Sequence, residues 1–477
     1  MDAWLDATAQ ADLVRTGQAT ARELVDAAID RIEALDPQIN AVVHRRFDRA
    51  RDEALSELPR GPFRGVPIVV KDELAMTGEP LTYGSAVLKD VAGSGPCRAD
   101  HDSFVAQKLR AAGFVVLGRT NMPELAVSVT TEPVAYGATA NPWDLTRSAG
   151  GSSGGSGAAV AAGMVPVAHA SDSGGSIRIP AAHCGLVGLK PTRGRISLGP
   201  KRGEAWGGAT VKGCVSRSVR DTAAMLDVLA GPMPGDPSTP PPPMRPFLEE
   251  VGAHQTALRI GLLDHPANLE VAGDPECAAA VQAAGALLAG LGHHVEEAWP
   301  DAMGEPDFTQ PYATLLAVEM ALEIEAMSDM LGRPIADDEL EPLVRIYPAM
   351  GRAIDGPRYL RSRRWLEAWS RRLAEWWAGG FDLLVMPVLN GVPPPLGYVT
   401  DPVEGFARLL PLVQYTAQAN VSGQPSISLP LHWSANGLPV GVQIMAAFGR
   451  EDLLLRIAAQ LEQASPWADR RPPISAA

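Results

Sequence analysis

A run of glycine and serine in the middle of the chain could either link two domains or expose bare backbone for chemistry. Nine of the ten residues from Ser148 to Gly157 are Gly or Ser, and an Ala-rich segment follows at once. Glycines leave backbone N–H groups uncovered, and a serine hydroxyl becomes a nucleophile when a base removes its proton. The run therefore suggests either a flexible linker or a site for nucleophilic chemistry.

Three simpler interpretations of this run fit poorly. A linker separates domains, whereas strand and helix patterns follow this run immediately. A phosphate-binding loop needs G-x-x-x-x-G-K-[ST] or G-x-G-x-x-G after a strand, and neither pattern is present here. Residues 151–155 match the G-x-S-x-G of a nucleophile elbow, but a polar, turn-rich segment precedes them instead of a strand.

A fourth interpretation takes the run together with the residues that follow it. The stretch 150–192, "GGSSGGSGAAVAAGMVPVAHASDSGGSIRIPAAHCGLVGLKPT", resembles the signature region of the amidase signature family of serine hydrolases. The resemblance extends to "GVPIVVKD", "GRTNMPE", "NVSGQPSISLP" and "GLPVGVQI", so it covers nearly the whole chain. Segments such as "TTEPVAYGATANPWDLTRS" are most similar to the bacterial branch that contains 6-aminohexanoate cyclic dimer hydrolases, aryl acylamidases and urethane-cleaving hydrolases.

The resemblance implies a catalytic triad of two serines and a lysine. It makes Ser176 of "DSGGS" the nucleophile, Ser152 of "GGSSGG" a bridging serine that follows a cis peptide bond, and Lys71 of "VVKD" the general base. A lysine serves as a base only when it is neutral, and burial after the apolar run "VPIVV" would lower its pKa toward neutrality. Asp72 would oppose that shift, but neighbouring residues of a strand face opposite sides.

An oxyanion site is expected next to the nucleophile. Small residues before Ser176 leave backbone N–H groups free to converge on the oxygen of a reacting carbonyl, and one such donor contributes about 3 to 4 kcal/mol to transition-state stabilisation. The donors expected from the resemblance are the backbone N–H groups of Ser173, Gly174, Gly175 and Ser176.

Three further residues are expected to support the triad. We expect Ser153 to hydrogen-bond to Lys71 or to the backbone of Ser152. Asp172 and Arg178 flank the nucleophile, and two roles are open for them: a buried ion pair that positions the loop, or direct contact with substrate.

The expected substrate is a small neutral amide or carbamate. The stretch after "GRTNMPE" corresponds to a pocket-lining stretch of the family and is small and mostly apolar, so we expect Ala126, Val127 and Ser128 to contact the substrate. Nylon-oligomer amides, anilides and urethanes are the candidate classes, and an ester presents a similar carbonyl. Two alternatives remain: the glutamine-hydrolysing subunit of a tRNA-dependent amidotransferase, and an inactive binding protein with the same fold.

Composition and charge indicate which classes of partner and which cellular location to expect. The formal net charge is -14, and no Lys/Arg cluster carries interleaved aromatic residues, so nucleic acid is not an expected partner. The acidic N-terminal segment does not have the pattern of a signal peptide, and the apolar runs are too short for a bilayer, so we expect a cytoplasmic protein without a membrane partner. Four scattered cysteines predict reduced thiols, no cofactor or metal is implied, and a homodimer is the expected assembly.

The elements that must position these residues alternate along the chain. The first 60 residues have helical patterns, including a capping box formed by Thr20 and Glu23. Eight short apolar runs, from "GVPIVVKD" to "VGVQIM", then alternate with helical stretches such as 101–112 and 153–163. The pattern predicts the α/β class, with one large mixed sheet covered by helices on both faces.

We expect one domain that spans residues 1–477. Its N-terminal helical segment covers about 1–60, and a mostly helical insert near the pocket covers about 300–380. The Pro-rich segment 231–246 cannot form regular structure and is expected to be an exposed crossing between two halves of the domain.

Overall fold

The structure is a computed structural model that describes residues 2–91, 97–267 and 271–477. Within these residues, eleven strands form one sheet in the order β1-β3-β2-β6-β8-β7-β12-β13-β11-β9-β10, and two more form a hairpin. The sheet contains β1 (Val42–Arg45), β3 (Val115–Thr120), β2 (Pro67–Lys71), β6 (Val167–Asp172), β8 (Val211–Ser216), β7 (Val187–Lys190), β12 (Ser426–Trp433), β13 (Pro439–Ala446), β11 (Leu383–Pro387), β9 (Arg259–Leu262) and β10 (His294–Glu297). The separate hairpin consists of β4 (Ala140–Asn141) and β5 (Asp144–Ser148).

The sheet is mixed, as predicted. Strand β2 runs parallel to β3 and β6, whereas β8 is antiparallel to β6 and β7, and β13 is antiparallel to β12 and β11. All eight apolar runs singled out in the sequence become strands of this sheet. Their β-branched residues fit the pleated, buried surface of central strands.

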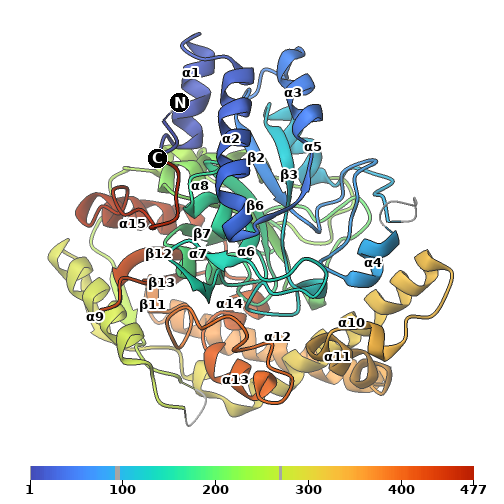
Figure 1. The fold of residues 1–477 in the computed structure, drawn as a ribbon. Helices are drawn as coiled ribbons and strands as arrows, with labels where there is room; N and C mark the ends of the chain where they lie inside the picture. The colour runs from blue at the N-terminus through green and yellow to red at the C-terminus, as the bar shows by residue number, and fades with distance from the viewer. Residues whose placement is uncertain (1, 92–96, 268–270) are drawn as a thin grey trace.

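Fifteen α-helices lie within the described residues, and Figure 1 shows them around the central sheet. They are α1 (Ala7–Arg15), α2 (Ala21–Ile39), α3 (Phe47–Leu55), α4 (Ala86–Val91), α5 (Phe104–Ala111), α6 (Gly154–Ala161), α7 (Arg178–Cys184), α8 (Val219–Leu229), α9 (Pro275–Gly290), α10 (Thr309–Leu331), α11 (Pro342–Arg352), α12 (Gly356–Ala378), α13 (Gly405–Leu412), α14 (Ala417–Ser422) and α15 (Glu451–Ala464).

Helices cover both faces of the sheet. Ile68 and Val70 of β2 belong to a core cluster with residues of α5, α8, α9 and α15, whereas Val69 belongs to a second cluster with α2, α6 and α7. Alternate residues of a strand point to opposite faces, so each face of β2 is packed against its own helical layer. This arrangement confirms the predicted fold class and buries β2 completely.

The N-terminal region differs from the helical expectation in one respect. Helix α2 begins with the predicted capping box of Thr20 and Glu23, but the strand β1 interrupts the helices between α2 and α3. Strand β1 pairs with β3 at an edge of the sheet. Four residues are too few to show a periodicity in the sequence, because a period-2 pattern needs several alternations.

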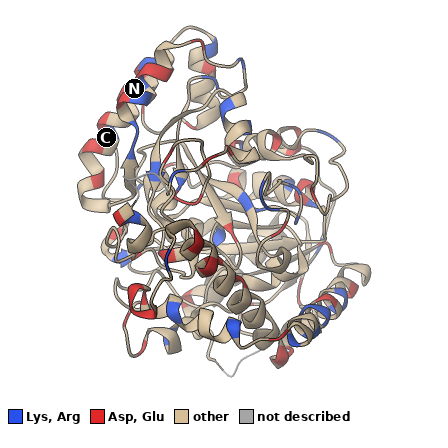
Figure 2. Ribbon diagram, turned by 90° about the vertical axis from the view of Figure 1, so that its right-hand side faces the viewer, with Lys and Arg blue, Asp and Glu red and all other residues tan. Residues whose placement is uncertain are grey.

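The outer surface carries charges of both signs. In the view of Figure 2, basic and acidic residues are interspersed along the outer helices. The segment 231–246 is irregular and largely exposed, as expected from its prolines. Within the described ranges, none of the helices has both the length and the hydrophobicity that a membrane crossing requires.

Candidate active site

Lys71 lies at the end of β2, with its side chain fully buried. Its ammonium nitrogen donates to the hydroxyl of Ser152 at 2.7 Å and to the hydroxyl of Ser171 at 2.8 Å. Burial lowers the pKa of Lys71 to about 8. Asp72 turns away and pairs with Arg119 at 2.7 Å, as the alternation of the strand predicts. Lys71 can therefore exchange a proton with two neighbouring hydroxyls near neutral pH.

Three polar neighbours of Lys71 were not predicted from the sequence. Ser171 accepts the second hydrogen bond of Lys71, and the carboxylate of Glu73 lies 3.8 Å from the lysine nitrogen. Lys212 of β8 pairs with Glu73 at 2.6 Å and is the direct cross-strand partner of Ser171. The segment that holds Lys212 was not recognised as a strand, so its register beside β6 could not be inferred.

The glycine-rich run places Ser152 beside Lys71. The peptide bond between Gly151 and Ser152 is cis, as the resemblance implies, and Ser152 is fully buried. At the first turn of α6, a Cβ on Gly155 would lie 2.5 Å from the backbone nitrogen of Asn121 and 2.6 Å from the carbonyl oxygen of Ala41. Only glycine allows this approach, so the run serves tight packing of α6 as well as access to its backbone.

Ser153 makes different hydrogen bonds from those expected. Its hydroxyl donates to the carbonyl oxygen of Ser171 at 3.3 Å and accepts from the backbone N–H of Ser171 at 3.4 Å. Within the described residues it bonds neither to Lys71 nor to the backbone of Ser152. The reason is that Ser153 precedes α6 with its hydroxyl turned to the backbone of β6, so it joins that helix to the strand that carries Ser171.

The loop after β6 carries the expected nucleophile. Ser176 is partly exposed, and its hydroxyl has no hydrogen-bond partner within the described part of the chain. Gly175 has φ +136°, a backbone conformation that favours glycine, and its N–H donates to Asp172 at 2.7 Å. This N–H is committed to the loop itself, so the expected oxyanion donors reduce to Ser173, Gly174 and Ser176.

Two side chains from distant helices hold this loop from outside. The hydroxyl of Tyr312, on α10, donates to the carbonyl oxygen of Ser173 at 3.2 Å. The hydroxyl of Thr416, just before α14, donates to the carbonyl oxygen of Gly174. Because both carbonyls are held, the N–H groups of the same peptide planes keep a fixed direction.

Asp172 and Arg178 form a fully buried ion pair under the loop. The guanidinium contacts both carboxylate oxygens at 3.0 Å, and Asn420 donates to the same carboxylate at 2.8 Å. Arg178 also donates to the side-chain oxygen of Gln443 at 2.6 Å. Burial alone would raise the pKa of Asp172, but the guanidinium holds it well below its usual value. Since neither side chain is exposed, the geometry favours the positioning role over substrate contact.

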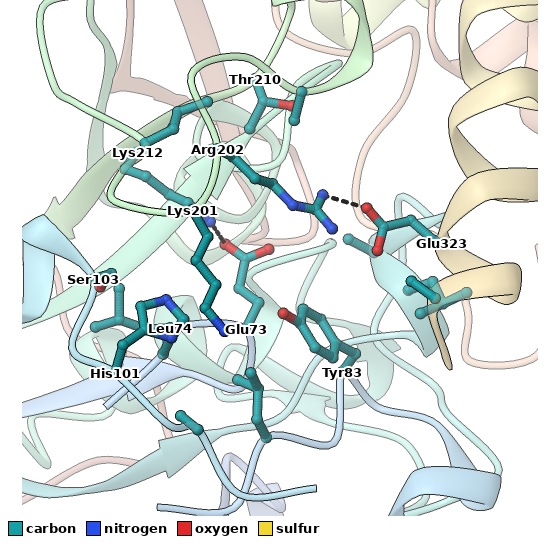
Figure 3. A pocket seen from close by; sticks show the side chains of 18 of the residues that line it. Glu73, Leu74, Tyr83, His101, Ser103, Lys201, Arg202, Thr210, Lys212 and Glu323 are labelled. Carbon is teal, nitrogen blue, oxygen red and sulfur yellow. Dashed lines mark hydrogen bonds and ion pairs between the residues drawn. The ribbon is translucent and has the colours of Figure 1, made fainter. Parts of the chain in front are cut away.

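A cavity of about 570 Å³ opens beside the loop at Ser173. Figure 3 shows its labelled charged side chains, among which Glu73 pairs with Lys212 and Arg202 pairs with Glu323 of α10. The remaining wall is largely apolar and includes Tyr83, Leu88, Leu125, Trp206, Met320 and Met327. The cavity is thus large and lined by paired charges as well as apolar groups.

The structure separates the three residues expected to contact the substrate. Ala126 lines the large cavity. Val127 and Ser128 line a different pocket of about 40 Å³, between Glu124 and the start of α11. Ala126 has φ +63°, so the chain turns there and directs the next two residues elsewhere. Within the described residues, no group of three or more His, Cys, Asp or Glu side chains is placed to hold a metal ion.

Comparisons with known proteins identify the family of the chain. The profile of the family described as Amidase matches residues 23–455. The chain is 46% identical to the 6-aminohexanoate-cyclic-dimer hydrolase of Paenarthrobacter ureafaciens over 484 residues, which cover 99% of this chain and 97% of that protein.

Solved structures give the same result. A structure of 6-aminohexanoate cyclic dimer hydrolase matches with a TM-score of 0.94 and 45% identity, and the match covers 99% of each chain. A bacterial aryl acylamidase of the amidase signature family matches with a TM-score of 0.87 and 28% identity, over 98% of this chain and 97% of that one. The resemblance seen in the sequence is thereby confirmed: the chain belongs to the amidase family.

Proposed function

We propose that the protein hydrolyses a neutral amide through an acyl-enzyme on Ser176, with Ser152 as the proton relay and Lys71 as the general base. One observation carries this proposal: the buried nitrogen of Lys71 lies 2.7 Å from the hydroxyl of Ser152 and 2.8 Å from that of Ser171, on the strand that leads into the loop with Ser176. The chain is an amidase by family, and the proposal assigns the chemistry to these three side chains.

The reaction proceeds in two halves. Neutral Lys71 takes the proton of Ser152, which takes the proton of Ser176, and the Ser176 oxygen forms a bond to the carbonyl carbon. When the C–N bond breaks, the proton returns through Ser152 to the departing amine, and an ester remains on Ser176. Water then attacks this ester by the same proton route and releases the carboxylic acid, which restores the three side chains.

The oxyanion of each tetrahedral intermediate needs donors that are already in place. We assign this role to the backbone N–H groups of Ser173, Gly174 and Ser176. The bonds from Tyr312 and Thr416 to the loop carbonyls, together with the buried carboxylate of Asp172, support the assignment because they hold the loop still before substrate arrives. Donors that need no reorganisation contribute most to catalysis.

The proposed substrate is a nylon-oligomer-type amide such as 6-aminohexanoate cyclic dimer. The high identity to a hydrolase of that name supports this choice, as does a cavity of about 570 Å³, which lies in the range of small-molecule sites. Six of the charged side chains on the cavity wall form pairs with each other, namely Glu73 with Lys212, Asp100 with Lys201, and Arg202 with Glu323, which suits an uncharged ligand. Anilides, urethanes and esters present a similar carbonyl to Ser176 and are proposed secondary substrates.

Product analysis by mass spectrometry tests the proposal. The protein and its Ser176→Ala, Lys71→Ala and Ser152→Ala variants are incubated with 6-aminohexanoate cyclic dimer, an anilide, a small aryl dicarbamate and glutamine. We expect cleavage by the wild type, loss of turnover in Ser176→Ala, nearly complete loss in Lys71→Ala and a small remainder in Ser152→Ala. Ser56→Ala, at an exposed position outside the site, serves as the matched control and retains full activity.

The other outcomes point to other functions. Wild-type turnover in Ser176→Ala contradicts the mechanism. Hydrolysis of glutamine alone would indicate an amidotransferase subunit. If no substrate were cleaved and a fluorophosphonate failed to label Ser176, the chain would be an inactive binding protein.

Assembly and location complete the proposal. We propose that the enzyme works as a homodimer in the cytoplasm. Four free, buried cysteines support a reducing compartment. Light scattering of the purified protein tests the first point, and fractionation of cells that produce it tests the second.

A further inference from the structure

We propose that Glu73 and Lys212 form a positioning pair that sets how readily Lys71 gives up its proton, with Lys212 offsetting part of the charge that Glu73 presents to the lysine. This inference rests on the proposed function, in which Lys71 is the general base. It concerns the chemistry of two residues that touch neither the reacting bond nor Ser176.

The pair is built from two strands that flank Lys71. Glu73 lies in the turn after β2, with its carboxylate 3.8 Å from the nitrogen of Lys71 and 2.6 Å from that of Lys212. Lys212 projects from β8, opposite Ser171 of β6, and Ser171 also accepts a hydrogen bond from Lys71. A carboxylate thus lies between two lysines and is closer to the one that is not the base.

The two charges act on Lys71 with opposite signs. The carboxylate of Glu73 favours protonated Lys71, whereas the ammonium of Lys212 disfavours it. Without Lys212, the carboxylate would face Lys71 alone, and the resulting ion pair would hold the lysine protonated. Without Glu73, the ammonium would act alone and remove the proton more readily. The opposing charges of Glu73 and Lys212 therefore keep the protonation of Lys71 between these two extremes.

The other charges around Lys71 are already compensated or neutral. On β6, Asp172 is paired with the buried Arg178. His169, also on β6, is fully buried, and burial lowers its pKa to about 3, so it is neutral. From β3, Arg119 is paired with Asp72 at 2.7 Å. Glu73 and Lys212 are thus the charges whose balance can be altered without breaking one of these buried pairs.

The position of the pair on the cavity wall allows it to be replaced. The side chains of Glu73 and Lys212 are 11% and 17% exposed, and Figure 3 shows both at the cavity. A neutral amide at either position can be hydrated from the cavity, so single substitutions leave no unsolvated polar group.

The test compares the pH dependence of Glu73→Gln, Lys212→Gln, the double variant and Lys212→Arg with the wild type. Two rates are measured: kcat/KM for 6-aminohexanoate cyclic dimer, and labelling of Ser176 by a fluorophosphonate. The acid limb of each profile reports the protonation of the base in the free enzyme. We expect it to move to lower pH in Glu73→Gln and to higher pH in Lys212→Gln, each by about one unit. We expect the acid limb of the double variant to lie close to that of the wild type, and the acid limb of Lys212→Arg to be unchanged.

The inference is overturned if the acid limbs of the two single variants move in the same direction, or if neither moves. A mere loss of structure would lower the rates but would not move the two limbs in opposite directions. If one single variant does not fold, the sign of the shift in the other decides. Failure of the proposed function looks different: Ser176→Ala would then keep its activity, or the wild type would resist labelling, whatever the limbs do.

Discussion

At the scale of single residues, the buried pair of Asp172 and Arg178 separates a structural role from a catalytic one. Both side chains are 0% exposed, and the carboxylate also accepts the N–H of Gly175. We expect Asp172→Asn to lower the free energy of unfolding by about 3 kcal/mol or more, because it leaves the guanidinium buried without a countercharge. Denaturant unfolding, followed by fluorescence, measures the change.

A matched control exists on the surface. Asp12 pairs with Arg15 at 3.0 Å, but these side chains are 57% and 72% exposed. Asp12→Asn removes the same charge and should change the free energy of unfolding by less than about 0.5 kcal/mol. Equal effects of the two substitutions would refute the positioning role.

The sequence predicted the residues of the site that lie in family motifs, but not the polar and charged side chains that surround Lys71. Ser152, Ser176 and Lys71 each lie in a recognisable motif. Ser171, Glu73 and Lys212 come together only when β2, β6 and β8 are in register, and sequence alone does not give that register. Asp72 is adjacent to Lys71 in the chain but points away from it. The turn after β2 instead directs the side chain of Glu73, two residues after Lys71, toward the lysine nitrogen.

The oxyanion donors and the substrate contacts were also predicted only in part from the sequence. A motif names candidate N–H groups, but it does not show that the N–H of Gly175 is bound to Asp172. It also does not show the turn at Ala126, which parts this residue from Val127 and Ser128. Both corrections depend on backbone direction, which a list of residues does not contain.

At the scale of elements, α6 depends on glycines that face other backbone. In Gly155→Ala, the new methyl group would lie within 2.6 Å of backbone atoms of Asn121 and Ala41. Backbone cannot move aside cheaply, so we expect the free energy of unfolding to fall by about 1 to 3 kcal/mol. Since α6 begins two residues after Ser152, the kcat for amide hydrolysis should fall as well.

Gly290, the last residue of α9, provides the comparison. A Cβ there meets nothing within 4 Å. Gly290→Ala should leave activity unchanged and raise the free energy of unfolding by about 0.5 kcal/mol, because alanine favours the helix and restricts the unfolded chain. If both alanines stabilised the protein, close packing would not be the reason for glycine in α6.

Two of the strands missed in the sequence, β1 and β10, have a common cause. Strand β10, "HVEE", is polar and lies at an edge of the sheet, and β1 is a short edge strand. Edge strands face solvent and carry charges that hide the alternation of buried strands. Central strands such as β2 and β13 are buried on both faces and were recognised from their apolar runs.

At the scale of the whole molecule, the two ends of the chain close over the same part of the sheet. The indole N–H of Trp4 donates to the carbonyl oxygen of Ala476 at 3.3 Å, and that of Trp467 donates to the carbonyl oxygen of Arg217 at 2.9 Å. Figure 1 shows the ends side by side, close to α1 and α8. Residues separated by nearly the full length of the chain therefore stabilise each other, and a titration at this junction should be seen in global unfolding.

Three carboxylates meet at this junction. Asp221 of α8 accepts the backbone N–H groups of Ala7 and Thr8 at the start of α1. Glu462 of α15 accepts the N–H of Val219 at 3.1 Å. Burial, with Asp6 nearby, raises the pKa of Asp221 to about 6, and burial raises that of Glu462 to about 7.

These raised values fix the sign of the pH dependence. A carboxyl whose pKa is higher in the folded state binds more protons there than in the unfolded chain. Its stabilising contribution is complete at a pH below the unfolded value and is lost as the pH rises through the folded value. For Glu462, the loss falls between about pH 4.5, the ordinary pKa of a glutamate, and about pH 7, its pKa in the folded state.

The substitution Glu462→Gln tests this assignment, because glutamine keeps an oxygen that can accept the N–H of Val219 but does not titrate. We expect its melting temperature to change less than that of the wild type between pH 5 and pH 8. At pH 8 the variant should be more stable by about 1 kcal/mol, since no charge is then buried at the junction. Glu57→Gln, at an exposed site, should reproduce the wild-type curve. A variant curve as steep as that of the wild type would show that the charge of Glu462 does not limit the stability of the closed chain ends.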